Sequence, residues 1–155
     1  PYLESPSVFA ALLDIERGGY FQIQPAAKYE SLQSYVENTN ILQTTFTTPL
    51  GVVVITDFMK PEGRRDNYYA REVFRKVECI SGTVELEINF NPRFDYAKVI
   101  PDFKLTEEGV IAQTKDESIF LQTPVPFNIY GQEVKGRVSL TGGKVIWFVL
   151  QHEHN

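Results

Sequence analysis

The chain has 155 residues, of which 43% are hydrophobic and 13% are aromatic, so it is long enough and apolar enough for one folded domain and is not a disordered segment. A formal net charge of −5, with no basic cluster beyond Arg64-Arg65, argues against a nucleic-acid partner. No apolar run approaches the roughly 20 residues of a membrane helix, so no membrane partner is expected. The single Cys79 cannot form an internal disulfide, which favours a reducing compartment, and we expect a cytoplasmic location.

The first part of the chain predicts little regular structure before its first strand. Residues 8–13 are expected to form a short helical turn that Gly18-Gly19 ends. A strand is expected from Tyr20 to Gln24, because polar and apolar residues alternate there up to Pro25. Residues 26–34 are polar and mixed, and they predict a loop or the start of a strand.

The next part predicts a hairpin followed by a loop. Residues 35–47 are rich in β-branched and aromatic residues, which favour a strand. A turn at Pro49-Leu50-Gly51 would join this strand to a second one over residues 52–58. Residues 61–67 are polar apart from one Pro and one Gly, and they predict a surface loop.

A strong strand signal lies between residues 84 and 90. Apolar and polar residues alternate there, as in a strand with one buried and one wet face, and Asn91-Pro92 ends the pattern because Pro lacks the N–H that a sheet needs. A strand over residues 69–80 precedes it, and we expect the two to form a second hairpin around Ser81-Gly82.

The rest of the chain predicts short strands separated by turns, and no segment shows a sustained helical period. Many short strands at this spacing indicate an all-β fold, an antiparallel β-sandwich of the supersandwich-like kind with few short helical turns. The inward sets Val52/Val54/Phe58 and Val84/Leu86/Ile88/Phe90 are expected to fill the space between two sheets. The remaining strands are expected over residues 110–114, 118–122, 127–130, 133–140 and 144–151.

The segment Pro92-Arg93-Phe94-Asp95-Tyr96 is too specific for an ordinary turn, and it resembles a segment of the N-terminal β-sandwich domain of glycoside hydrolase family 15, the glucoamylase and trehalase type. Other segments agree with that family in the same order. Departures from the family pattern occur at Glu4, Lys60 and Ala97, at surface turns. The agreeing segments are Ser5 to Phe9, Leu12-Leu13-Asp14, Gly18-Gly19, Thr39 to Phe46, Asp57-Phe58-Met59, and Arg71 with Val77-Glu78-Cys79 and Ser81-Gly82.

The resemblance implies a non-catalytic role for the chain. In this family such a domain precedes a barrel of paired helices, which carries the two catalytic Glu residues and inverts the anomeric centre of an α-glucoside. Residues 1–155 would then be a single β-sandwich domain, a fragment of a larger hydrolase that lacks the family's first hairpin and the helical barrel. The chain alone is expected to have no activity, and its expected partner is that barrel. Self-association through an open edge or an apolar face is also expected.

The same resemblance directs attention to a small set of site candidates. The aromatic and charged residues after the strand end could bind carbohydrate, but we favour the simpler interpretation that Arg93 and Asp95 pin the turn or a neighbouring domain through hydrogen bonds. No cofactor and no catalytic residue is expected in this chain. The carbohydrate or domain-interface candidates are Arg93, Asp95, Tyr96, Ser5 and Ser7.

Two alternatives from other functional classes stay open. A free-standing carbohydrate-binding module would use exposed aromatic residues such as Trp147 as platforms, and a small metal enzyme would use His152 and His154, which face the same way in an extended strand. Two His residues do not complete a metal site, so we expect no metal there. Cys79 lies in an apolar run and is expected to be a buried small hydrophobe.

Overall fold

The computed structural model describes residues 18–59, 71–95 and 98–154, and within these ranges the chain forms strands and no helix. The helical turn expected at residues 8–13, the loop expected at 61–67, and Ser5, Ser7 and Tyr96 lie outside the described residues. No helix in the described part of the chain is long and apolar enough to cross a membrane. The strands are β1 (Tyr20–Pro25), β2 (Glu30–Tyr35), β3 (Leu42–Thr48), β4 (Gly51–Met59), β5 (Arg71–Asn91), β6 (Asp102–Thr106), β7 (Gly109–Gln113), β8 (Glu117–Gln122), β9 (Phe127–Tyr130), β10 (Glu133–Thr141) and β11 (Val145–His154).

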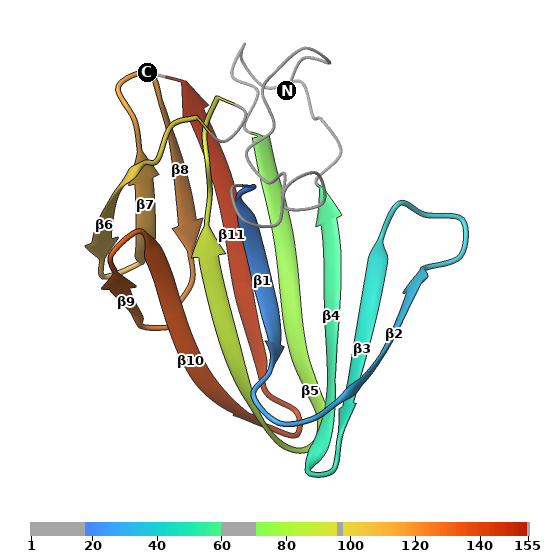
Figure 1. Cartoon of the computed structure of the whole chain (residues 1–155). Helices are drawn as coiled ribbons and strands as arrows, with labels where there is room; N and C mark the ends of the chain where they lie inside the picture. The colour runs from blue at the N-terminus through green and yellow to red at the C-terminus, as the bar shows by residue number, and fades with distance from the viewer. Residues whose placement is uncertain (1–17, 60–70, 96–97, 155) are drawn as a thin grey trace.

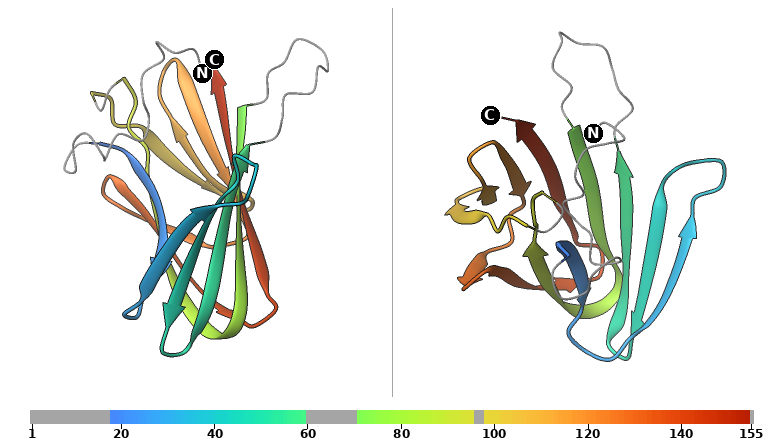
Figure 2. Two further views of the ribbon diagram at one scale, coloured as in Figure 1. Left: turned by 90° about the vertical axis from the view of Figure 1, so that its right-hand side faces the viewer. Right: turned by 45° about the horizontal axis from the view of Figure 1, so that its top comes forward.

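The strands form two antiparallel layers that share β5, which confirms the all-β, sandwich-like fold (Figure 1). The larger sheet has the order β2-β3-β4-β5-β11-β8-β7-β6, and the smaller sheet consists of β1, β5, β10 and β9. The two layers meet at the end of the molecule where β5 bends and lie farther apart toward the opposite end (Figure 2). The first half of β5 belongs to the larger sheet and the second half to the smaller one.

The bend in β5 corrects the hairpin expected around Ser81-Gly82. The two halves of this strand pair with different neighbours and not with each other. Ile80 is the extra residue of a β-bulge, because β4 pairs Val52 with Ser81 and Val53 with Cys79. Gly82 has a φ of 70°, and a Cβ there would lie 1.9 Å from the carbonyl oxygen of Leu50. The Ser-Gly signal therefore marks a sharp bend in a continuous strand, since a bulge and a turn require the same backbone freedom.

The core lies between the inner faces of the two sheets. Val84, Leu86, Ile88 and Phe90 are all at most 2% exposed, as their alternation predicts. The expected inward set on β4 is wrong, because Val53 and Ile55 are the buried residues, and Val52, Val54 and Phe58 are on the outer face. Residues 52–55 form an unbroken apolar run, so the sequence pattern does not show which of them face the core.

Two further strand boundaries differ from expectation. The strand expected over residues 35–47 is interrupted by a turn, in which Val36 N–H donates to the carbonyl of Ile41 and Asn38 takes a φ of 58°. Asn tolerates this left-handed backbone better than most residues, so the segment splits into the end of β2 and the whole of β3. Strand β6 was not predicted, although its five residues alternate between polar and apolar as in other short strands.

Candidate binding cleft and docking face

A cleft of about 610 Å³ opens between β1 and the inner face of the larger sheet. It exists because the two layers differ in width. On this side the smaller sheet ends at β1, while the larger sheet continues past β4 to β3 and β2. The inner face of these two outlying strands is therefore not covered by a facing strand among the described residues, and β2 is exposed along its whole length.

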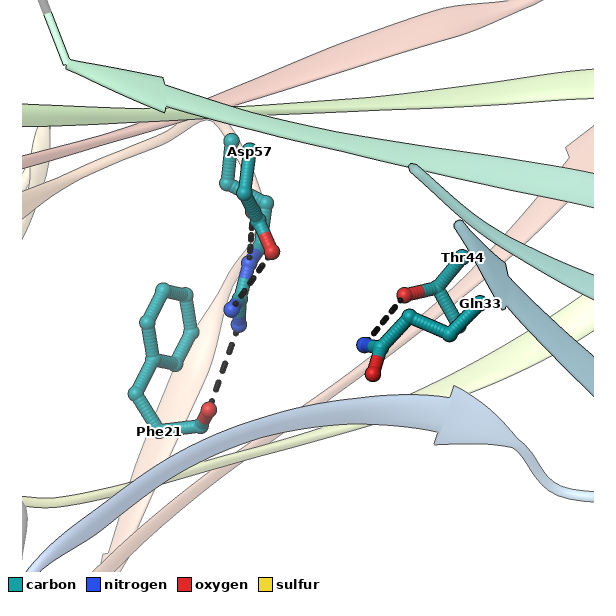
Figure 3. A network of polar contacts seen from close by, with 5 residues as sticks. Phe21, Gln33, Thr44 and Asp57 are labelled. Carbon is teal, nitrogen blue, oxygen red and sulfur yellow. Dashed lines mark hydrogen bonds and ion pairs between the residues drawn. The ribbon is translucent and has the colours of Figure 1, made fainter. Parts of the chain in front are cut away.

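Arg75 and Asp57 form the charged part of the cleft lining. They lie on neighbouring strands in register, and the guanidinium makes a bidentate contact with the carboxylate, with Nε–Oδ1 at 2.6 Å and NH2–Oδ2 at 3.2 Å. The NH1 group of Arg75 also donates to the carbonyl of Phe21 on β1, at 3.2 Å, and the guanidinium carbon lies 4.6 Å from the centre of that ring. Figure 3 shows Asp57 and Phe21 on opposite sides of the cleft, joined through this bonding. Arg75 thus ties the two sheets together across the cleft.

A second polar pair lies in the cleft on the outlying strands. The Gln33 amide donates to the Thr44 hydroxyl at 2.9 Å, and Figure 3 shows this pair facing the space between β1 and the larger sheet. The ring of Tyr29 packs edge-on against that of Phe46 with centroids 5.0 Å apart. The cleft lining therefore combines polar groups with aromatic rings.

The outer face of the larger sheet carries an aromatic stripe, defined here as Phe58, Phe74 and Trp147. Phe58 and Phe74 pair directly across β4 and β5, and their rings are stacked with centroids 5.4 Å apart. Trp147 on β11 meets Phe58 edge-on at 6.1 Å and is 42% exposed. The register places Val54 and Val149 on the same face. Val149 pairs with Phe74 and extends the stripe, whereas Val54 is separated from it by Thr56 and Lys76. Exposed apolar surface of this kind marks contact sites in soluble domains.

The outer face of the smaller sheet has the opposite character. Arg137 on β10 contacts Glu87 through NH2, and its NH1 lies 3.0 Å from Glu85. Lys135 and Glu133 form another exposed pair, and their hydrogen bond raises the pKa of Lys135. Exposed ion pairs of this kind are typical of a solvated face.

The structure gives the predicted candidates Arg93 and Asp95 separate partners. Arg93 donates to the Asn91 side chain and to the Pro92 carbonyl, and its burial lowers the pKa of the guanidinium. Asp95 takes a φ of 46° in the turn that follows, and its carboxylate lies 3.7 Å from the Lys98 ammonium. Arg93 therefore contacts the end of β5 and Asp95 contacts the turn that follows, and within the described residues no hydrogen bond or ion pair joins the two side chains.

The His pair near the end of the chain is also only partly placed. Nε2 of His152 lies 2.8 Å from a carboxylate oxygen of Glu117 on the neighbouring strand. The side chain of His154 lies outside the described part of the structure. Within the described residues no group of three His, Cys, Asp or Glu could hold a metal ion, and the absence of a bound metal stays a prediction. Cys79 is fully buried, as expected, and its thiol donates to the Ser81 carbonyl.

Sequence reasoning missed Arg75, although a signal for it was present. Arg75 stands two residues before the matched segment Val77-Glu78-Cys79, whereas Arg71, which was grouped with that segment, stands six residues before it. The aromatic stripe was missed because its members come from three strands. Only the sheet register shows that Phe58, Phe74 and Trp147 meet.

Comparisons with known proteins extend over nearly the whole chain. A family model described as "Trehalase-like, N-terminal" matches residues 1–145. A trehalase of Thermoplasma acidophilum is 33% identical over 152 residues, which cover 96% of this chain and 26% of that protein. A trehalase of Mycobacterium tuberculosis is 27% identical over 173 residues, which cover 97% of this chain and 25% of that protein. The chain therefore spans about a quarter of the length of these curated relatives.

Proposed function

Because the chain belongs to the trehalase-like N-terminal family, we propose that it is the non-catalytic β-sandwich domain of a larger trehalase-type enzyme, in which it packs against and stabilises a helical catalytic domain. The relatives named trehalase are about four times as long as the matched region, which leaves room for such a domain. In this proposal the acid and base groups that hydrolyse an α-glucoside with inversion lie outside this chain, and the enzyme works in the cytoplasm.

The aromatic stripe is the observation that carries the packing role. Its three rings pack on one another, so the stacked faces of Phe58 and Phe74 are not open platforms for sugar rings. Polar contacts flank the stripe, with Lys76 bonded to Glu78 on one side and Gln151 to Glu72 on the other. An apolar centre with a polar rim is the usual anatomy of a protein interface. The candidates Arg93, Asp95, Tyr96, Ser5 and Ser7 would contribute to contacts outside the stripe.

The packing role can be tested by separating the two parts of the enzyme. The chain and the sequence that follows it in its gene would be produced as two polypeptides, and their binding would be measured by calorimetry. Trp147→Ser should weaken binding by about thirtyfold or more, because central aromatic contacts in interfaces contribute about 2 kcal/mol or more. Tyr130→Ser is the matched control, since Tyr130 is a 60% exposed aromatic residue on the smaller sheet, and it should leave binding unchanged.

Three results would contradict the proposal. One is a reading frame that encodes no further domain, and another is an equal effect of the two substitutions. The third is turnover of trehalose or maltose by the 155-residue chain alone, above a heat-inactivated control. If the isolated chain self-associates and Trp147→Ser abolishes that association, the stripe is apolar enough to dock, as proposed.

A further inference from the structure

The cleft between β1 and the larger sheet has the properties of a small-molecule site that the packing role does not use. It is on the inner side of β2 to β5, whereas the aromatic stripe is on the outer side of the larger sheet. We propose that this cleft binds a neutral saccharide of one or two sugar rings, by hydrogen bonds to the Asp57–Arg75 and Gln33–Thr44 pairs. This inference does not depend on the proposed function.

The charge of the cleft favours a neutral ligand. Asp57 and Arg75 are the ionised residues of the described lining, and their bidentate contact cancels the two charges locally. An anionic ligand would meet the Asp57 carboxylate, and a cationic ligand would meet the Arg75 guanidinium. A polyhydroxylated ligand avoids both conflicts, because each hydroxyl can donate to a carboxylate and accept from a guanidinium.

Both polar pairs keep hydrogen-bonding capacity toward the cleft. Arg75 uses three of its five N–H groups on Asp57 and Phe21, so one N–H is left on each terminal nitrogen for contacts beyond those made with the described residues. The Asp57 carboxylate can accept further bonds, and both side chains are 22% exposed. Gln33 uses one N–H on Thr44, and its carbonyl oxygen and second N–H make no hydrogen bond to the other described residues.

The open edge of β1 adds backbone groups but is a poor template for a peptide strand. Ala26 N–H donates to the carbonyl of Glu85, so Ala26 belongs to a hydrogen-bonded pair with β5. In an antiparallel ladder every second residue belongs to such a pair. The backbone N–H and C=O groups of the residues between them, Phe21, Ile23 and Pro25, therefore point away from β5. Pro25 has no N–H, and the Phe21 carbonyl already accepts from Arg75. Ile23 alone keeps both a donor and an acceptor in the cleft, which suits one sugar ring and not an added strand.

The size and the apolar surfaces also fit a sugar. A volume of about 610 Å³ lies within the roughly 300–1,000 Å³ of small-molecule pockets. Tyr29 stands at the cleft and is 37% exposed, and its ring is held edge-on against the buried Phe46. A fixed and accessible aromatic ring beside converging polar groups can contact the apolar face of a pyranose.

The test is a titration of the 155-residue chain with glucose, trehalose, glucuronate and glucosamine, followed by calorimetry and by NMR shifts of side-chain amides. We expect a Kd on the order of 1 mM for the neutral sugars, with shifts at Gln33. Gln33→Ala should weaken binding by about threefold to tenfold. Gln43→Ala is the matched control, because Gln43 bonds to Thr56 on the outer face of the same sheet, and it should change nothing.

Three results would overturn the inference. They are the absence of binding by either neutral sugar at tens of millimolar, tighter binding of glucuronate or glucosamine than of glucose, and an equal effect of the two Gln substitutions. Unchanged thermal unfolding of both variants in the absence of sugar shows that any loss of binding is local. None of these measurements involves the catalytic domain, so they separate this inference from the packing role.

Discussion

The outer faces of the two sheets differ in a way that their inner faces do not. Both inner faces contribute to one apolar core, in which Val53 and Leu86 are at most 1% exposed. Outside, the smaller sheet carries Arg137 bonded to two glutamates, while the larger sheet carries the aromatic stripe. A sheet needs one apolar face to fold, so the aromatic stripe on the outer face of the larger sheet is not required by the core. This difference is what we expect if the smaller sheet faces solvent and the larger sheet faces the proposed partner.

The largest expected effect contrasts the inside and the outside of the smaller sheet. Leu86→Ala should lower the free energy of unfolding by about 2–5 kcal/mol, because it leaves a cavity in a close-packed core. The neighbouring Glu85→Ala, on the exposed face, should change it by about 0.5 kcal/mol. Denaturant unfolding of both variants checks this. Similar losses would mean that the smaller sheet has no distinct inner face.

The next effect concerns the bend that joins the two sheets. Gly82→Ala and Gly131→Ala both place a side chain on left-handed backbone, with φ of 70° and 61°, which costs about 1–2 kcal/mol. Gly82→Ala should cost clearly more, because its Cβ would collide with the Leu50 carbonyl, whereas nothing lies within 4 Å of a Cβ at Gly131. Thermal unfolding separates the two variants. Equal midpoints would show that the bend tolerates a side chain.

The smallest effect compares two arginines that each contact acidic side chains. Arg75→Met should cost about 1–3 kcal/mol, because it removes a partly buried bidentate pair and the bond to the Phe21 carbonyl. Arg137→Met should lower the free energy of unfolding by about 0–1 kcal/mol, because its ion pairs are exposed. High salt should remove this loss, because it screens exposed charges. Unfolding at low and high ionic strength measures both. An equal salt dependence would place Arg75 in solvent.

The sequence predicted those features that depend on neighbouring residues and missed those that depend on register. The alternation from Val84 to Phe90 correctly predicts the inner face of the second half of β5. The unbroken apolar run from Val52 to Ile55 does not show which residues face inward, because this strand carries apolar residues on both sides of its sheet. A two-residue pattern cannot distinguish a sharp bend from a hairpin, since both need Gly82. The resemblance, in contrast, identified the family without any of these details.

The cleft could not be predicted at all, for a related reason. It depends on the larger sheet extending two strands beyond the smaller one, and no local pattern reports how many strands face each other. Asp57 and Arg75 stand 18 residues apart in sequence. Only the pairing of β4 with β5 brings them into contact.

The sharing of β5 between the layers has a consequence for the order of events during synthesis. Among the described strands β1 is synthesised first, but its partner is the second half of β5, roughly 65 residues later. At about 5–20 residues per second, the apolar side of β1 waits several seconds for that partner. The β3–β4 hairpin can close earlier, yet it too completes its pairing only with β5. The strands that precede β5 in both sheets therefore depend on its synthesis, and a nascent chain that stalls before residue 91 presents unpaired strands to chaperones and proteases.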